Sequence, residues 1–434
     1  MINKKFISIA EALKKGSGRV AVHGWIYRER GSNEFKFIVL RDSSNIIQCI
    51  LKKDKFQDKW EEIDKLQVES SLEIEGSIKK DKRAPTCYEI EADKINIVGI
   101  SKDFPINKSL NEELLGDRRH LWLRSRKMTA IMKIRSTVFN AIHEYFRKNK
   151  FYEYQSPILQ AVQCEGGSSL FNVDYFGKKG VFLAQTWQLY AEPAIFALEK
   201  IYTLAPSFRA EESKTSRHLT EYWHAEMEVA WASFKEIQDY GEGLIKHVVK
   251  KVLKENKLEL EILKRDIKKL EPAVKKNFPR MTYDDALKIL KEKAKIKITW
   301  GKDLRTIEED ALSKLYDTPI IVTNYPKEVK AFYMKETEGN PKVVNGCDFI
   351  APEGYGEIIG GSEREADPEK IKKRLIEMKE NPEHYSFYLD TRKYGSVPHG
   401  GFGMGVERVI SWICGLETIK DAIAFPRTMT RYKP

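Results

Sequence analysis

The stretch YLDTRKYGSVPHGGFGMGVER, from Tyr388 to Arg408, carries four glycines in the seven residues before Val406. The pattern from Gly400 to Gly415 predicts a strand, a glycine cluster and a helix. Because glycine has no side chain, the cluster lets the backbone approach a ligand closely, and Arg408 stands at the start of the predicted helix. The chain has no P-loop, GxSxG, HExxH or dinucleotide-binding sequence. We therefore expect a ligand site of another kind here.

Two further elements precede this stretch. FYEYQSPIL (151–159) follows a segment at 127–149 with the apolar spacing of an amphipathic helix, and it predicts a strand that ends at Pro157. FRAEESKTSRHLTEYWHAEME (208–228) predicts two strands around a polar loop, with Arg209 where the loop opens. Each element alone is weak evidence, since an arginine on a strand is usually solvated or paired at the surface. Their order along the chain is specific.

Together the three elements resemble the three motifs of the class II aminoacyl-tRNA synthetases, and the sequence around them is similar to the aspartyl/asparaginyl branch. The resemblance spans the chain from its N-terminal strands to the terminal FPRT. It implies an α+β fold in which an antiparallel sheet flanked by helices carries the catalytic site. Strands separated by long insertions, without regular βα alternation, also favour an antiparallel core.

The first hundred or so residues predict a separate domain. Five segments alternate apolar with polar residues between turns, and one helical stretch lies near 55–66. Five strands and one helix suggest a small closed β-barrel of the OB type. We predict an OB-fold anticodon-binding domain at 1–105, a linker at 106–126 and a class II catalytic domain at 127–434. A mostly helical insertion is expected at about 234–295 within the catalytic domain.

The composition describes a globular protein with a basic excess. Of 434 residues, 41% are hydrophobic, and the formal charge of +11 favours a polyanionic partner. Residues 235–297 hold 18 basic and 11 acidic residues, which fits either a solvated helical face or a phosphate-facing surface. No apolar run reaches the roughly 18 residues of a membrane span, and the N-terminus lacks the order of a signal peptide. The five cysteines form no CxxC pair, so we expect reduced, structural thiols in a cytoplasmic protein with no membrane partner.

The resemblance implies attack of an amino-acid carboxylate on the α-phosphate of ATP, followed by acyl transfer to the 3′ end of a tRNA. This chemistry depends on positioning and charge neutralisation, so arginines and magnesium should dominate. By motif match, the catalytic residues are Arg209 at the α-phosphate, Arg408 at the γ-phosphate and Glu357. The further ATP-binding residues are Glu211 at the adenine amino group, Arg217 and His218 on the loop, and Tyr222 beneath the adenine.

The resemblance also implies Mg²⁺ bound together with ATP. Glu357 matches the family's metal-binding glutamate, and Asp348 is the second candidate ligand. Magnesium prefers oxygen ligands and keeps several waters. The chain departs from the pattern at Gly360, where many aspartyl members carry a serine, so a water is expected to replace a second protein ligand.

Recognition of the amino acid rests on fewer positions. By motif match, Glu165 and Gln188 bind the α-ammonium group, and Arg364 meets the side-chain oxygen. Aspartyl enzymes carry a lysine at the position of Ala191, which gives the substrate carboxylate a second cation.

The second motif supplies another difference, because Glu226, two residues after His224, stands where aspartyl members carry an aspartate. A carboxylate accepts a hydrogen bond from an amide NH₂ group and repels a second carboxylate. One donor and one acceptor therefore suit asparagine, and the wrong substrate would leave buried polar groups unpaired. The alternative is that Glu226 pairs with His224 or Arg364 as scaffold.

The predicted barrel supports a tRNA partner independently. Phe37 and Gln48 match the positions where the family stacks an aromatic ring on, and hydrogen-bonds, the central uridine of the anticodon. Arg28, with Arg30 and Arg41, is placed to contact phosphates. The aspartate and asparagine anticodons share that uridine, so the barrel does not separate the two.

The sequence thus predicts ligation of L-asparagine to tRNA(Asn) by a homodimer of the archaeal or eukaryotic type, since the motif ending at Pro157 forms a dimer interface in this class. An aspartyl enzyme, strict or non-discriminating, is the first alternative. A paralogue that amidates aspartate without tRNA is the second, and the barrel residues argue against it. A protein that only binds nucleic acid is the third, and Arg209, Glu357 and Arg408 argue against that.

Overall fold

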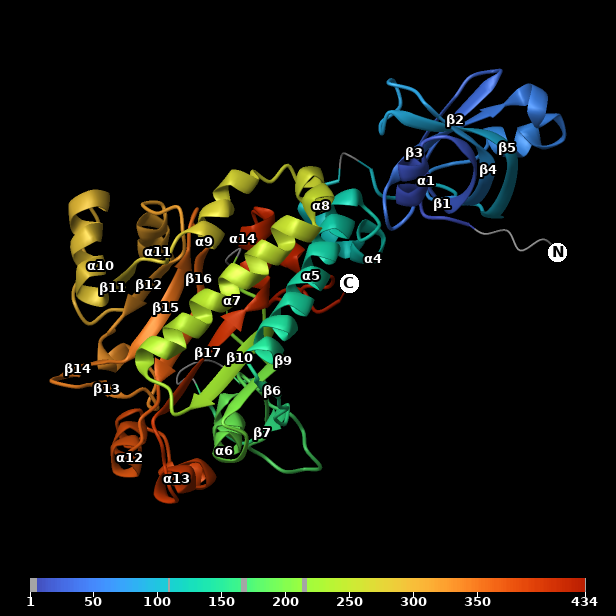
Figure 1. The fold of residues 1–434 in the computed structure, drawn as a ribbon. Coiled ribbons are helices and arrows are strands. Elements are labelled where there is room, and N and C mark those ends of the chain that lie inside the picture. The colour runs from blue at the N-terminus through green and yellow to red at the C-terminus, as the bar shows by residue number, and fades with distance from the viewer. Residues whose placement is uncertain (1–5, 108–109, 165–169, 213–216, 434) are drawn as a thin grey trace. The chain divides into compact units, whose positions relative to one another are not determined.

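The structure is a computed structural model that describes residues 6–107, 110–164, 170–212 and 217–433. The chain divides into two compact units, Met1–Glu112 and Glu113–Pro434 (Figure 1). The division falls inside the segment predicted as a linker. None of the described helices is both long and apolar enough to cross a membrane.

The N-terminal unit is a closed five-stranded barrel in the order β1-β2-β3-β5-β4, which confirms the predicted architecture. Its interior is aliphatic because alternate residues of each strand point inward. In β2, for example, Ile38 and Leu40 are fully buried, whereas Phe37 is only partly buried. The elements of this unit are α1 (Ile9–Lys15), β1 (Gly18–Gly31), β2 (Phe35–Arg41), β3 (Ile46–Lys52), η1 (Lys53–Lys55), η2 (Gln57–Lys59), α2 (Trp60–Asp64), β4 (Ser71–Lys80) and β5 (Tyr88–Gly99).

The second unit is built on an eight-stranded sheet in the order β11-β12-β15-β16-β17-β10-β9-β6. All neighbouring strands pair antiparallel except the two outermost pairs, β11 with β12 and β6 with β9. The prediction of an antiparallel core is therefore confirmed, with parallel edges added. The strands are β6 (Tyr152–Glu153), β9 (Lys200–Phe208), β10 (Glu221–Ala230), β11 (Arg280–Thr282), β12 (Ile320–Thr323), β15 (Gly346–Ala351), β16 (Gly356–Glu363) and β17 (His399–Gly405).

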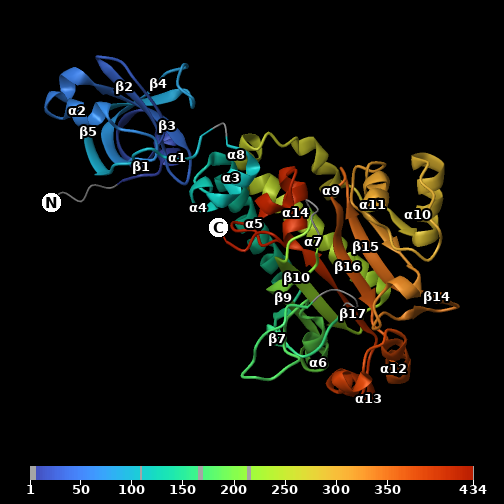
Figure 2. The ribbon, with the colours of Figure 1, turned by 180° about the vertical axis from the view of Figure 1, so that it is seen from behind.

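Helices α5 (Arg126–Lys148) and α7 (Phe234–Glu255) lie side by side across one face of this sheet, as both views show (Figures 1 and 2). Ser125 and Ser233 cap their N-termini, because each side-chain hydroxyl accepts a backbone hydrogen bond that the helix cannot otherwise use. The apolar faces of both helices and of α14 (Val406–Cys414) share one core with the sheet. The opposite face of the sheet carries the cavities described below.

The segment predicted as a helical insertion belongs to this core. It is mostly helical, but α7 buries Leu244, Val248 and Val252 against the sheet, and β11 adds an edge strand to it. Its other elements are α8 (Lys257–Ile262), η3 (Ile267–Lys269), α9 (Glu271–Lys275), α10 (Tyr283–Ile289) and a π-helical turn η4 (Leu290–Ala294).

The C-terminal half of the predicted linker is ordered against the second unit. It forms α3 (Glu112–Asp117) and α4 (Arg119–Trp122), and the buried guanidinium of Arg119 donates to the carbonyls of Lys420, Ile423 and Ala424. The remaining elements are β7 (Leu159–Gln160), β8 (Phe182–Leu183), α6 (Gln188–Leu198), α11 (Thr306–Ser313), η5 (Lys327–Val329), β13 (Glu336–Thr337), β14 (Asn340–Val344), α12 (Pro368–Glu377), η6 (Pro382–Tyr385), α13 (Ser386–Lys393) and η7 (Ile419–Ala422).

Candidate active site

Strands β9, β10 and β17 bring the sequence elements together on one face of the sheet. β9 and β10 form an antiparallel pair, so that Arg209 lies where β9 ends and Tyr222 lies near the start of β10. β17 pairs with the other edge of β10, and α14 follows it directly, which places Arg408 in the first turn of that helix. The chain end closes the hairpin, because Thr220 N donates to the carbonyl of Arg427 at 2.9 Å.

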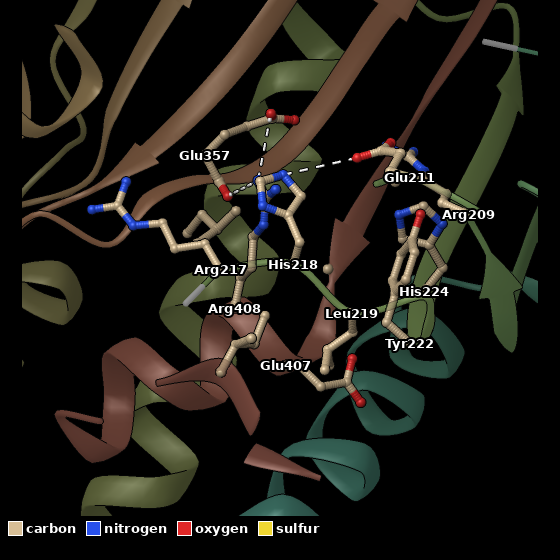
Figure 3. Close-up of a pocket in the computed structure, with 14 residues that line it drawn as sticks. Arg209, Glu211, Arg217, His218, Leu219, Tyr222, His224, Glu357, Glu407 and Arg408 are labelled. Carbon is tan, nitrogen blue, oxygen red and sulfur yellow. Dashed lines mark hydrogen bonds and ion pairs between the residues drawn. The ribbon is translucent and has the colours of Figure 1, made fainter. Parts of the chain in front are cut away.

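A first cavity, here called the arginine cavity, contains every residue predicted to bind ATP. Figure 3 shows Arg209, Tyr222 and His224 on one side of it and Arg217, Arg408 and Glu357 on the other. It is lined, among others, by Arg209, Glu211, Arg217, His218, Tyr222, Glu357 and Arg408. Three guanidinium groups in one cavity suit a polyphosphate, because planar forked donors match phosphate oxygens.

Hydrogen bonds fix these cations within the arginine cavity. Arg408 Nη1 donates to the carbonyl of Glu357 at 2.8 Å and lies 3.6 Å from its Oε2. Arg217 Nη2 donates to Asp310 Oδ1 at 2.7 Å. The guanidinium carbon of Arg209 lies 5.5 Å from the centre of the Tyr222 ring. The cationic groups are thus held in place by side-chain and backbone groups of both strands and helices.

The two histidines of the site are neutral near pH 7. Burial, together with the charges of Arg209 and Arg408, lowers the pKa of His224 to about 3. Burial and the charge of Arg408 also lower the pKa of His218. The positive charge of the arginine cavity therefore comes from its arginines, and the histidines act as neutral hydrogen-bonding groups.

A second cavity, here called the carboxylate cavity, adjoins the first. It holds six carboxyl side chains, and it is lined, among others, by Gln188, His224, Glu226, Glu228, Asp303, Glu328, Lys330, Asp348, Glu357 and Arg364. Arg209, His224, Glu357 and Gly403 line both cavities. A Cβ atom added at Gly403 would lie 3.4 Å from His224 Nε2 and 3.6 Å from Glu226 Oε1, so a longer side chain would fill the junction between the two.

Glu226 is engaged by the protein at both oxygens. Thr186 Oγ1 donates to Oε1 and Trp187 N donates to Oε2 at 3.0 Å. His224 Nδ1 lies 3.7 Å from Oε2 and forms a 3.1 Å hydrogen bond with Ser207 Oγ. This arrangement favours the scaffold interpretation of Glu226, which anchors the start of α6.

The carboxylate beside Arg364 is instead Glu228, which sequence reasoning did not assign to the site. Arg364 Nη2 donates to Glu228 Oε1, and Nε donates to Oε2 at 3.4 Å. Burial raises the pKa of Glu228 while the charge of Arg364 opposes the shift, and the two-point contact uses the carboxylate as an acceptor. The sequence feature that could have pointed to Glu228 is the two-residue period of β10, which puts His224, Glu226 and Glu228 on one face of the strand.

Ala191 contributes nothing to the wall of either cavity. It is fully buried in α6 and packs with Trp187, Ile195 and Ile201. Gln188 lines the carboxylate cavity, Glu192 accepts from the Gln188 amide, and Ala191 faces the apolar cluster. The expected effect of position 191 on the charge near the substrate is therefore not seen as a contact in the wall of either cavity.

The residues predicted to hold magnesium lie close to Gly360, which carries no side chain. A Cβ at Gly360 would lie 2.8 Å from Glu357 Oε1 and 3.7 Å from Asp348 Oδ1. Lys330 Nζ lies 2.7 Å from Asp348 Oδ2, so a protein cation already neutralises part of this charge. Among the described residues, no three His, Cys, Asp or Glu side chains are grouped to hold a metal by themselves. The donor set fits an ion that takes one or two carboxylates and completes its shell with phosphate and water.

Glu165, the other predicted ligand of the α-ammonium group, lies outside the described residues. Gln188 is buried at the start of α6 and lines the carboxylate cavity. Glu309, on α11, was not predicted. It accepts from Glu357 N at 3.2 Å, and burial with the nearby charge of Glu357 raises its pKa to about 7. Three consecutive acidic residues in a helix, Glu308 to Asp310, give no sequence signal that one of them contacts Glu357.

The predicted anticodon residues lie on one outer face of the barrel. Gln48 pairs in register with Val39, which pairs with Arg28, and Phe37 pairs with Arg30. The Arg30 guanidinium carbon lies 4.7 Å from the centre of the Phe37 ring. Gln48 Nε2 donates to Glu89 Oε2 at 3.0 Å. An aromatic ring, an amide and two arginines thus share a surface suited to a single-stranded base and its phosphate.

Comparison with known proteins identifies the fold family. Residues 111–429 match the family described as tRNA synthetases class II (D, K and N), and residues 20–98 match the OB-fold nucleic acid binding domain. The chain belongs to the class II tRNA synthetases of the D, K and N group.

The relatives and solved structures that the chain matches include asparagine–tRNA ligases. The chain is 46% identical to the asparagine–tRNA ligase of Thermoplasma acidophilum, over 99% of this chain and 100% of that protein, and 45% identical to that of Thermococcus gammatolerans over both full lengths. It matches the crystal structure of asparaginyl-tRNA synthetase from Pyrococcus horikoshii complexed with asparaginyl-adenylate with a TM-score of 0.95 and 41% identity, covering 100% of both chains. The Entamoeba histolytica asparaginyl-tRNA synthetase matches with a TM-score of 0.86 and 30% identity, over 96% of both chains.

Proposed function

We propose that this chain is an asparagine–tRNA ligase: it activates L-asparagine with ATP as asparaginyl-adenylate and then esterifies the asparaginyl group to tRNA. The observation that carries the proposal is the junction of the two cavities. Arg209 lines both, so one guanidinium lies where a carboxylate from one cavity meets a phosphate from the other. The relatives named above agree in this function along the whole chain.

In the first step, a carboxylate oxygen of asparagine attacks the α-phosphorus and pyrophosphate leaves. Arg209 neutralises charge on the α-phosphate, and Arg408 and Arg217 hold the departing phosphates. Neutral His224 lies beside Arg209 and donates or accepts a hydrogen bond without adding charge. In the second step, a ribose hydroxyl of the tRNA attacks the carbonyl carbon of the mixed anhydride, and AMP leaves.

Magnesium enters with ATP in this proposal. Glu357 and Asp348 would hold it, and the ion would supply further neutralisation of phosphate charge. Lys330 Nζ donates to Asp348 Oδ2 at 2.7 Å and so fixes the direction of that carboxylate.

Selection of the amide rests on Arg364 and Glu228. A guanidinium donates to the amide oxygen, and a carboxylate accepts from the amide NH₂, so the pair satisfies both ends of an asparagine side chain. Aspartate would place a second negative charge against Glu228. The assignment of the acceptor role thus moves from Glu226 to Glu228.

The barrel face with Phe37 and Gln48 would read the anticodon of tRNA(Asn), and we expect two copies of the chain to associate. Support for a dimer comes from apolar side chains left exposed around the first motif, where Tyr152 is 61% and Leu159 42% exposed. An apolar surface of this kind commonly marks an interface between copies.

Amino-acid-dependent exchange between ATP and pyrophosphate tests the activation step without tRNA. Exchange with asparagine and none with aspartate is expected. Exchange with aspartate alone would contradict the proposal, and added ammonia would then distinguish tRNA charging from amide synthesis. Charging of tRNA(Asn) transcript with labelled asparagine tests the second step.

A further inference from the structure

A buried carboxylate behind the carboxylate cavity links two residues of its wall. Glu192 of α6 is completely buried, and the described residues that line the cavity include Gln188 and Arg364 but not Glu192. Gln188 Nε2 donates to Glu192 Oε1 at 2.8 Å, and Arg364 Nε lies 3.9 Å from the same oxygen. One carboxylate therefore contacts both residues from the side opposite the cavity.

The contact with Gln188 fixes which end of its amide meets a ligand. Because the Nε2 group donates to Glu192, the carbonyl oxygen Oε1 is turned the other way, where Cys164 Sγ approaches it at 3.7 Å. A thiol is a weak donor, so Oε1 keeps its capacity to accept. An ammonium group needs an acceptor, and the reversed amide would present NH₂ and repel it.

Arg364 is held between two carboxylates in the same way. Glu228 contacts it from the cavity wall and Glu192 from behind, while Arg364 Nη1 donates to Ser362 Oγ at 2.6 Å. Because Nε, Nη1 and Nη2 each contact a protein oxygen, the guanidinium is fixed in direction, and its remaining N–H groups are preset toward a side-chain oxygen.

Glu192 is itself held as a charged group. Arg392 Nη2 donates to Oε2, Tyr388 Oη lies 2.9 Å from both oxygens, and His399 Nε2 lies 3.0 Å from Oε2. Although burial opposes ionisation, the charge of Arg392 and the contact with His399 lower the pKa of Glu192. These partners come from α13 and β17, so residues of the third motif region support the amino-acid pocket.

We propose that Glu192 is the positioning residue of amino-acid recognition: it orients the Gln188 amide and the Arg364 guanidinium without touching the substrate. The inference rests on the proposed function, since it assigns the carboxylate cavity to asparagine. It predicts an effect confined to asparagine, because no partner of Glu192 lines the arginine cavity among the described residues.

The test is a double-mutant cycle of Glu192→Gln and Gln188→Ala, read by pyrophosphate exchange. In the wild type, the donors around Glu192 share two carboxylate oxygens. Glu192→Gln leaves them a single carbonyl oxygen, so the Gln188 amide is released. The expected result for Glu192→Gln is a KM for asparagine raised by about 10- to 100-fold, with the KM for ATP unchanged. Adding Gln188→Ala should then cost far less than it costs in the wild type, because coupled residues are not additive.

A second readout isolates the ammonium contact. Succinamate is asparagine without its α-amino group, and its inhibition constant relative to the KM of asparagine measures recognition of the ammonium group. That ratio should fall toward one in Glu192→Gln. The matched control is Glu242→Gln, another buried carboxylate, which bonds Phe278 N and Arg280 away from both cavities and should leave the ratio unchanged.

Additive effects in the cycle, or an unchanged ratio for succinamate, would overturn the role of Glu192. If Glu192→Gln does not fold, Tyr388→Phe removes one donor to Glu192 and should raise the KM for asparagine severalfold; an unchanged KM would overturn the role equally. Wild-type protein that shows no asparagine-dependent exchange would instead contradict the proposed function, so the two failures are distinct.

Discussion

Arg364 Nε lies 3.4 Å from Glu228 Oε2 in the wall of the carboxylate cavity, and both side chains are almost fully buried, with 3% and 2% of their surface exposed. A buried pair of this kind is held in one geometry by the packing around it. Its donor and acceptor ends therefore select a ligand by charge as well as by shape.

Replacement of Glu228 tests this selection. In Glu228→Gln the wall no longer repels a carboxylate, so the ratio of kcat/KM for asparagine to that for aspartate should fall by about 10- to 100-fold. The measurement is pyrophosphate exchange with each amino acid. Glu226→Gln is the matched control, because it alters a carboxylate two residues away that bonds Thr186 and Trp187. An unchanged ratio in Glu228→Gln would remove Glu228 from amide recognition.

Removal of the arginine shared by both cavities should abolish most activation. Arg209→Ala takes away a preorganised cation at the reacting phosphate, and the expected loss in exchange rate is about 10²- to 10³-fold. Arg83→Ala, on the exposed surface of the barrel, should leave the rate unchanged. Near-normal exchange by Arg209→Ala would show that the second motif was misassigned.

The neutral histidine of the active site makes stability depend on pH. His224 has a pKa of about 3 in the folded chain against 6.5 when exposed, so the unfolded chain binds an extra proton between these values. Stability from this group is full above pH 6.5 and is lost as the pH falls. At pH 5 the loss is about 2 kcal/mol.

Denaturant unfolding at pH 7.5 and pH 5 measures this effect. His224→Gln should lose less stability between the two pH values than the wild type does, by about 2 kcal/mol. His120→Gln, at an exposed position, should follow the wild type. Parallel losses in His224→Gln and the wild type would contradict a neutral His224.

The barrel surface should affect tRNA alone. Phe37→Ala removes a ring on which a base stacks, worth about 1–3 kcal/mol, so the KM for tRNA(Asn) should rise about tenfold or more. Pyrophosphate exchange should not change, because it needs no tRNA. Val98→Ala, an exposed position on another strand of the same barrel, is the control. A normal KM for tRNA in Phe37→Ala would place the anticodon elsewhere.

The period of the strands and the order of the motifs were sufficient to predict the barrel, the antiparallel core and the gathering of Arg209, Arg217, His218 and Arg408 in one cavity. They left the role of a side chain undetermined where its hydrogen-bond partner decides that role. Glu226 and Glu228 look alike in sequence, and only the hydrogen bonds of Thr186 and Arg364 separate them.

Ala191 and α7 show two features that the sequence left undetermined. The direction of Ala191 depends on how α6 packs, which a residue-by-residue match does not contain. The segment expected as a mostly helical insertion is mostly helical, and the buried stripe that joins α7 to the sheet occupies only one face of that helix.

The bond from Thr220 to Arg427 joins two segments that lie far apart in the chain. Arg427 follows α14 and η7, so the hairpin that carries Arg209 is closed by a segment that is remote from it in sequence. A stop codon shortly before residue 427 would therefore yield a chain that retains the core of the second unit and lacks this closure.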